Sequence, residues 1–310
     1  MTELNNTLTP VVIESWFIPL DIIPMFALIL TIIFDCIFLI LIIFDKACHT
    51  LQMMFIAYTC FAQLLTSINM TWVYIFLLEN DLKQLQYYNS MCLFRGYFTP
   101  ASCAMMIHSF TLQTFHRYMT AVYPTHLFWQ LIRTQLFLMC ISFVFCLLFP
   151  LIPLLTGYIV YNVYNQNCEI LFSFNFGVIW ISSCTYNVPV VIIIFLYFRL
   201  VLYAKSINNV ATAVNVFFRA QRELKMVKQI VILVSMLLIF GVPYVTFIFT
   251  SFFTNIPLYH YRISHVFVVL PYPILLATLF YFTEPLKDSL RKLFSGRRNL
   301  TGLSTTLTNR

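Results

Sequence analysis

Residues 22–44 read IIPMFALILTIIFDCIFLILIIF, and Asp35 is the single charged side chain in this stretch. A helix needs about 20 consecutive, mostly apolar residues to cross the hydrocarbon core of a bilayer. The segment Ile22–Phe44 is long enough, and its composition suits lipid as the surrounding solvent. We therefore predict that it forms a membrane-spanning helix.

Other stretches of the chain have the same apolar character and length. In chain order they are Leu51–Leu78, Cys92–Val122, Leu136–Val160, Leu171–Tyr203, Met226–Phe253 and Ile263–Phe282. The chain of 310 residues is 61% hydrophobic and 9% charged, whereas soluble domains are about 25% charged. The sequence thus predicts an all-α membrane protein, a bundle of seven transmembrane helices with short connections.

The basic residues predict how this bundle is oriented. With the N-terminus outside, fifteen of the eighteen Lys and Arg residues fall on the inner side, and only Lys83, Arg95 and Arg262 fall on the outer side. This asymmetry follows the positive-inside rule. The net charge of +7 is then explained by attraction to anionic membrane lipid, and nucleic acid is the poorer explanation.

This orientation divides the chain into three parts. Residues 1–21 form an extracellular N-terminus, in which Asn5 begins an N-glycosylation sequon. Residues 22–282 form the seven-span domain, and residues 283–310 form a cytoplasmic tail. At the start of the tail, Leu286, Leu290 and Leu293 share one face of a possible helix. We predict an amphipathic helix lying on the inner leaflet, with a frayed tail as the alternative.

The third span carries the most specific pattern. Cys92 lies at its outer end and His116-Arg117-Tyr118 at its inner end, and 25 residues of helix span about 37 Å. Glu223 precedes Pro243 of the sixth span by 20 residues. These spacings resemble those of rhodopsin-like G-protein-coupled receptors. The run HRYMTAVYPTHLFW at residues 116–129 further resembles nematode serpentine chemoreceptors, especially classes g and v.

The sequence departs from the rhodopsin-like pattern at several positions. Gly241 stands where the family has Trp, and Ala277 and Thr278 replace its Asn-Pro pair. His116 takes the place of the acidic residue before Arg117. The family resemblance nevertheless implies a chemoreceptor that binds a small odorant or pheromone-like ligand and signals to a heterotrimeric G-protein. It also implies a multi-pass protein in the plasma membrane, as in chemosensory neurons, with no cofactor and no metal.

The same resemblance implies roles for particular residues. Cys92 and Cys168 correspond to the disulfide that ties the second outer loop to the third span, although two free thiols are the alternative. Arg117 and Glu223 correspond to an ion pair that holds the inactive state, although each charge could instead simply extend to the interface. Activation-switch and hinge positions are Tyr197, Tyr281 and Pro243.

Two further sets of residues are predicted inside the bundle. Asp35 is the one carboxylate deep in a predicted span, and Gln63 is its predicted partner; a protonated, purely structural Asp35 is the alternative. A ligand pocket is expected among the outer halves of the third, fifth, sixth and seventh spans. Its candidate residues are Thr99, Cys103, Ser182, Thr185, Tyr244, Phe247, His265 and Tyr272, although any of them could instead serve packing or lipid contact.

Two other functional classes fit the sequence less well. A membrane enzyme needs catalytic groups at one depth, but His108 and His116 lie toward the inner side, whereas His260 and His265 lie outside. A seven-span ligand-gated channel or a transporter is the remaining alternative. Transporters have internal repeats and Gly-interrupted helices, and this chain has only six Gly residues.

Overall fold

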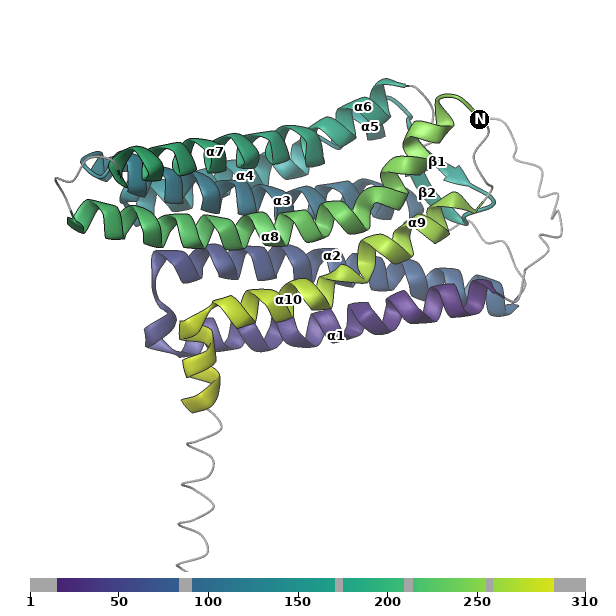
Figure 1. The fold of residues 1–310 in the computed structure, drawn as a ribbon. Helices are drawn as coiled ribbons and strands as arrows, with labels where there is room; N and C mark the ends of the chain where they lie inside the picture. Colours follow the sequence, from purple (N-terminus) through teal and green to yellow (C-terminus); the bar gives the residue numbers. More distant parts are fainter. Residues whose placement is uncertain (1–15, 84–90, 171–174, 209–213, 255–258, 293–310) are drawn as a thin grey trace, which may run out of the picture.

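A computed structural model describes residues 16–83, 91–170, 175–208, 214–254 and 259–292, with the backbone alone for 207–208 and 214–226. Figure 1 shows long helices running side by side, with a small β-hairpin at one end of the bundle. We call this the outer end, following the orientation that the charges predict. The helices are α1 (Phe17–Phe44), α2 (Leu51–Lys83), α3 (Cys92–Val122), α4 (Ile132–Leu148), α5 (Leu151–Leu155), α6 (Phe176–Ser182), α7 (Val188–Asn208), α8 (Val214–Ser251), α9 (His260–Val269) and α10 (Pro271–Phe282).

Short elements connect or interrupt these helices. Two 3₁₀ turns, η1 (Lys46–Cys48) and η2 (Leu127–Gln130), follow α1 and α3. A π-helical turn, η3 (Ser183–Asn187), links α6 to α7, so that α6, η3 and α7 form one continuous span. Likewise, α9 and α10 form one span that is interrupted near Pro271, whose ring removes a backbone donor.

The helix α3 lies in the middle of the bundle. Among the described residues, six helical stretches are long and apolar enough to cross a membrane, and α3 completes the bundle as a more polar helix. It packs against α2, α4, α7 and α8. Its polar residues Ser102, Ser109 and Thr114 are fully buried, and Ser109 pairs with Thr59 of α2 at 2.8 Å. Because α3 faces protein rather than lipid, it does not need a continuous apolar surface.

The loop after the fourth span differs from the prediction. The predicted span 136–160 ends earlier, because α4 stops at Leu148 and the short α5 stops at Leu155. Gly157 then turns the chain with a φ of 75°, a conformation that glycine adopts without strain. Residues Ile159–Asn162 form β1, which pairs antiparallel with β2 (Asn167–Ile170). The fifth span begins later than predicted, at Phe176, where the Asn175 side chain caps the helix, and it continues to Asn208, beyond the predicted end at Tyr203.

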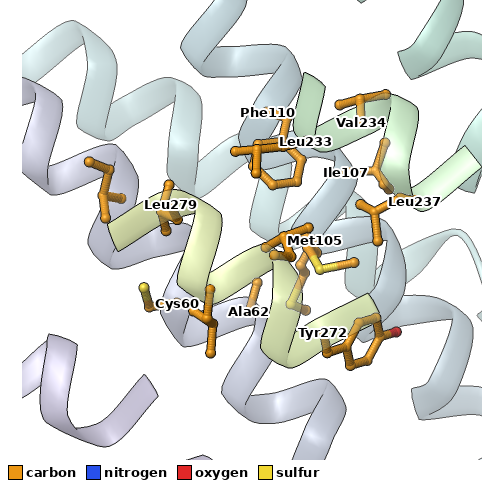
Figure 2. Close-up of a cluster of buried hydrophobic side chains, with 14 of the residues drawn as sticks. Cys60, Ala62, Met105, Ile107, Phe110, Leu233, Val234, Leu237, Tyr272 and Leu279 are labelled. Carbon is orange, nitrogen blue, oxygen red and sulfur yellow. The ribbon is translucent and has the colours of Figure 1, made fainter. Parts of the chain in front are cut away.

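One part of the hydrophobic core joins α2, α3, α8 and α10 in the middle of the bundle. Figure 2 shows Met105, Ile107 and Phe110 of α3 facing side chains of α2, α8 and α10. Other members of this cluster are Cys60, Ala62, Leu233, Val234, Leu237, Tyr272 and Leu279. By contrast, apolar residues such as Phe26 and Phe44 are 70% and 80% exposed on the outside of the bundle. Such an apolar exterior is suited to lipid contact.

The predicted amphipathic helix is present. Residues 284–292 are helical after Thr283 and turn away from the bundle axis beyond α10 (Figure 1). Leu286 is fully buried against the core. Ser289 donates to Asp45 Oδ2 at 2.6 Å, and Lys292 Nζ lies 3.6 Å from the same carboxylate oxygen. This helix is therefore anchored to the turn after α1 by both apolar and polar contacts.

Candidate functional site

The β1–β2 hairpin covers the outer end of the bundle, and a disulfide joins it to α3. Cys92, the first residue of α3, is bonded to Cys168 of β2. One turn further along α3, a Cβ atom at Gly96 would lie 2.6 Å from the Cys168 carbonyl oxygen and 2.9 Å from Ile159 Cγ2. The hairpin therefore lies directly on the α3 backbone. The disulfide that the family resemblance implied is present in the structure.

A buried arginine joins three helices beneath the hairpin. Arg262 of α9 donates to both carboxylate oxygens of Asp81 in α2, and it donates to Asp21 Oδ2 of α1 at 3.3 Å. Gln166 of the hairpin also donates to Asp81, at 3.1 Å, and the Phe17 ring lies 4.6 Å from the Arg262 guanidinium carbon. All three charged side chains are buried. Removing one partner from a buried ion pair costs about 3–5 kcal/mol because the other charge is left unpaired, so each member of this cluster requires the others.

A carboxyl group of the hairpin points into the same region. Glu169 Oε1 accepts hydrogen bonds from the side-chain amides of Asn162 and Asn165. His260 Nε2 of α9 lies 3.9 Å from the same oxygen, and the Phe247 ring of α8 lies 6.3 Å from the His260 ring. Burial raises the pKa of Glu169 to about 7, although the two amide hydrogen bonds lower it. Glu169 therefore changes its charge close to neutral pH.

Aromatic side chains of α8 and α9 form a layer below the hairpin. Asn167 of β2 donates to the Tyr261 hydroxyl at 3.0 Å. The Tyr261 ring stacks on His265 with ring centres 3.8 Å apart, and Tyr244 meets His265 edge to face at 5.9 Å. Tyr244 and His265, both predicted ligand-binding residues, are thus neighbours. The layer combines apolar ring surface with a few polar groups, as small-molecule sites do.

The remaining predicted ligand-binding residues fall into two groups. Cys103 Sγ of α3 lies 3.9 Å from the Tyr272 hydroxyl of α10, and both residues are buried. Thr185 is buried in η3, and its hydroxyl has no hydrogen-bond partner among the described atoms. Thr99 donates to a carbonyl group of its own helix and accepts a hydrogen bond from Asn69 of α2, whereas Ser182 donates to a carbonyl group of its own helix. Seven of the eight predicted residues, all but Ser182, therefore have side chains engaged between helices or left with an unpaired buried hydroxyl.

The predicted switch residues lie at the inner end and are only partly described. The side chain of Glu223 lies outside the described residues, so its pairing with Arg117 stays a prediction. Tyr197 packs against the small cluster of α3, α7 and α8 at this end. Tyr281 is 70% exposed, and Lys287 Nζ lies 5.6 Å from its ring centre. Tyr281 therefore faces away from the bundle interior, which does not fit the predicted switch position.

The predicted pairing of Asp35 with Gln63 is wrong in this structure. Asp35 is fully buried, and neither of its carboxylate oxygens has a hydrogen-bond partner at normal distance and angle among the described residues. The Cys60 thiol is its polar neighbour. Gln63 Nε2 donates instead to the Tyr272 backbone carbonyl at 3.0 Å. Gln63 thus connects α2 to the interrupted seventh span.

Two predicted features concern other parts of the chain. Pro243 lies inside the continuous helix α8, and its role as a hinge stays a prediction. Asn5 lies outside the described residues. Within the described part of the chain, no group of three or more His, Cys, Asp or Glu side chains is placed to hold a metal ion.

Comparisons with known proteins identify the architecture. The sequence matches no protein family and no curated protein. The structure is similar to the crystal structure of squid rhodopsin, with a TM-score of 0.76 and 16% sequence identity, over 91% of this chain and 86% of that chain. The chain has the rhodopsin-like seven-transmembrane fold. It is a multi-pass membrane protein with the architecture of a G-protein-coupled receptor.

In this rhodopsin-like bundle, the buried charges of the outer end were not predicted. The predicted spans begin at Ile22 and Ile263 and end at Leu78, so Asp21, Asp81 and Arg262 fall outside them. The helices continue through these positions, and the charges pair with each other inside the protein. Arg95 was predicted only as one of three outer cations, and Glu169 was given no role.

Proposed function

We propose that this chain is a G-protein-coupled receptor, which binds a small external ligand in its outer half and activates a heterotrimeric G-protein at its inner end. The observation that carries the proposal is the rhodopsin-like fold, shared over 91% of the chain. The excess of basic residues on the predicted inner side supports the orientation that such signalling requires.

The outer half supplies the features of a ligand site. Six helices and the hairpin converge there, and the layer formed by Tyr244, Tyr261 and His265 lies above Cys103 and Tyr272. Aromatic walls with a few hydroxyl, thiol and imidazole groups suit a small, mostly apolar molecule. We further propose an odorant or pheromone-like ligand, because residues 116–129 resemble nematode serpentine chemoreceptors. The plasma membrane of chemosensory neurons is the corresponding location.

The proposal is tested by expressing the receptor in cells that contain promiscuous G-proteins. A library of volatile and water-soluble small molecules is applied, and intracellular calcium and cAMP are recorded, with surface expression measured by an N-terminal tag. We expect at least one compound to give a response that saturates with concentration. The matched control is Arg117→Ala, which should reach the cell surface and fail to respond. A response that persists in Arg117→Ala cells, or with G-protein inhibitors present, would contradict G-protein coupling.

A ligand-gated channel or transporter is separated by two further measurements. An epitope tag before residue 1 should be accessible to antibody in intact cells, and a tag after residue 310 only in permeabilised cells. Whole-cell recordings with G-protein signalling blocked should show no ligand-gated current. Inverted tag accessibility, or a current under these conditions, would favour the channel or transporter.

A further inference from the structure

Arg95, in the first turn of α3, is a buried cation that has no counter-ion among the described residues. Its side chain is 0% exposed, and Nε, Nη1 and Nη2 all lack a hydrogen-bond partner in the described part of the chain. The other buried outer arginine, Arg262, has two carboxylates in contact with it. Arg95 therefore lacks the carboxylate partners that offset the cost of burying the Arg262 guanidinium.

The surroundings of Arg95 only partly compensate for its burial. The Phe76 and Trp72 rings of α2 lie with their centres 4.4 Å and 5.4 Å from the Arg95 guanidinium carbon. Such cation–π contacts are weaker than the loss of hydration of a buried ion. The position also works against a cation, because the N-terminus of a helix carries partial positive charge. The loop 84–90, which joins α2 to α3, contains no Asp or Glu that could supply a counter-charge.

A second unpartnered donor lies on the same face of α2. Asn80 follows Phe76 by four residues, one helical turn nearer the outer end, and its Nδ2 is buried with no hydrogen-bond partner among the residues that the structure describes. Below Phe76, Asn69 of α2 donates to Thr99 Oγ1, which in turn donates to the Arg95 carbonyl. These bonds hold the two helices in register at this level. Guanidinium and amide donors thus occur together in an apolar setting.

We propose that Arg95 binds the oxyanion, most simply the carboxylate, of a small amphiphilic ligand, with Asn80 as an additional donor. A guanidinium offers two parallel N–H groups to a carboxylate, and this pairing is strongest where water is excluded. The Phe76 and Trp72 rings would contact the apolar part of such a ligand. Because Arg95 is covered in the structure, binding requires one of these rings to change rotamer. The inference rests on the proposed function as a ligand-binding receptor.

Binding is measured without any G-protein, on purified full-length receptor in phosphatidylcholine nanodiscs. The probes are hexanoate, octanoate and decanoate, each compared with its methyl ester. We expect at least one carboxylate to raise the Tm of the wild type, while its ester does not. Arg95→Gln should weaken that affinity by more than about tenfold, and Asn80→Leu should weaken it less. The control Arg133→Gln, at the inner end, should bind as the wild type does.

A second measurement tests the unpaired charge itself in the absence of ligand. Arg95→Met removes a buried cation without leaving an anion unpaired, so the ligand-free Tm should rise. Arg262→Met leaves Asp21 and Asp81 unpaired, so its Tm should fall. Nanodiscs containing phosphatidylserine form a further arm: stabilisation of the wild type there, without added carboxylate and lost in Arg95→Met, would identify a lipid headgroup as the source of the oxyanion.

The outcomes separate this inference from the proposed function. The inference is overturned if neither a carboxylate nor phosphatidylserine stabilises the wild type, if ester and acid act alike, or if Arg95→Met lowers the Tm as Arg262→Met does. Carboxylate binding that depends on Arg95, together with a failure to activate any G-protein, would contradict the proposed function and leave the oxyanion site standing. G-protein activation by uncharged ligands alone, with unchanged potency in Arg95→Gln, would do the reverse.

Discussion

Glu169 illustrates how one buried side chain can make the outer end of the bundle sensitive to pH. Its pKa is about 7 in the folded chain and 4.5 in its ordinary state. Because folding favours the protonated form of this carboxyl, the contribution of Glu169 to stability is fully present below pH 4.5. This contribution is lost progressively as the pH rises through about 7. The groups that face it are the amides of Asn162 and Asn165 and the imidazole of His260.

We therefore predict a pH-dependent difference between the wild type and Glu169→Gln, which cannot ionise at this position. The wild-type Tm, measured on purified receptor, should fall relative to that of Glu169→Gln as the pH is raised from 5 to 8. Most of the change should occur between pH 5 and 7, where the carboxyl is ionised in the unfolded chain and still largely protonated in the folded one. Parallel Tm curves for the two proteins across this range would show that Glu169 does not ionise with a raised pKa.

At the level of single residues, the sequence predicts the disulfide cysteines but not the ion cluster. Cys92 and Cys168 stand out because they lie at span boundaries and match a family pattern. Asp21 and Arg262 each lie one residue outside a predicted span, where a hydropathy argument places them in water. Their pairing depends on α1, α2 and α9 meeting at the outer end. That meeting is a tertiary contact, and no local pattern in the sequence encodes it.

Among the structural elements, the hairpin was the least predictable. Ile159 and Val160 continue an apolar run, so they were assigned to the fourth span, although they form part of β1. The conformation of β1 depends on a distant partner, β2, and on a disulfide that holds both strands over α3. The spanning helices were predictable because their lipid-facing surface requires long apolar runs. The hairpin has no such requirement and can use mixed residues.

The close approach of the hairpin to α3 leads to a prediction about two glycines. Gly96→Ala should destabilise the receptor by about 1–3 kcal/mol, because the new methyl group would lie 2.6 Å from the Cys168 carbonyl oxygen. Gly241→Ala is the matched control, since nothing lies within 4 Å of its added Cβ. In the helix α8 that change should stabilise the protein by about 0.5–1 kcal/mol. Thermal unfolding of the two variants gives the comparison, and equal Tm shifts would mean that the hairpin is not seated on α3.

On the scale of the whole molecule, the two ends of the bundle are built differently. The outer end is held by a disulfide, by a buried ion cluster and by a stacked aromatic layer. At the inner end, α3, α7 and α8 meet through a small apolar cluster of Ala121, Leu200 and Val227. Among the described residues, the outer end thus has covalent and ionic links between its elements, whereas this part of the inner end is held by apolar packing.

The last prediction concerns this inner cluster. Arg117 lies one helical turn from Ala121 in α3, and Glu223 lies one turn from Val227 in α8. Because α3 and α8 run antiparallel, these two turns lie on opposite sides of the shared cluster, and an ion pair requires both long side chains to extend toward each other across it. If Arg117 and Glu223 pair across it, the closed state gains about 0.2–1 kcal/mol from a partly exposed ion pair. Glu223→Ala should then raise ligand-independent signalling by up to about fivefold.

The measurement is basal cAMP or calcium signalling, normalised to surface expression by an N-terminal tag. Glu284→Gln removes an exposed inner carboxylate outside this cluster and should leave basal signalling unchanged. In the double variant Arg117→Gln/Glu223→Ala, the increase should disappear, because Arg117 is also expected to contact the G-protein. A Glu223→Ala receptor that is fully expressed and has wild-type basal signalling would show that the apolar cluster alone keeps the inner end closed. The free-energy cost of opening the inner end would then be the cost of repacking Ala121, Leu200 and Val227, and not the cost of separating two charges.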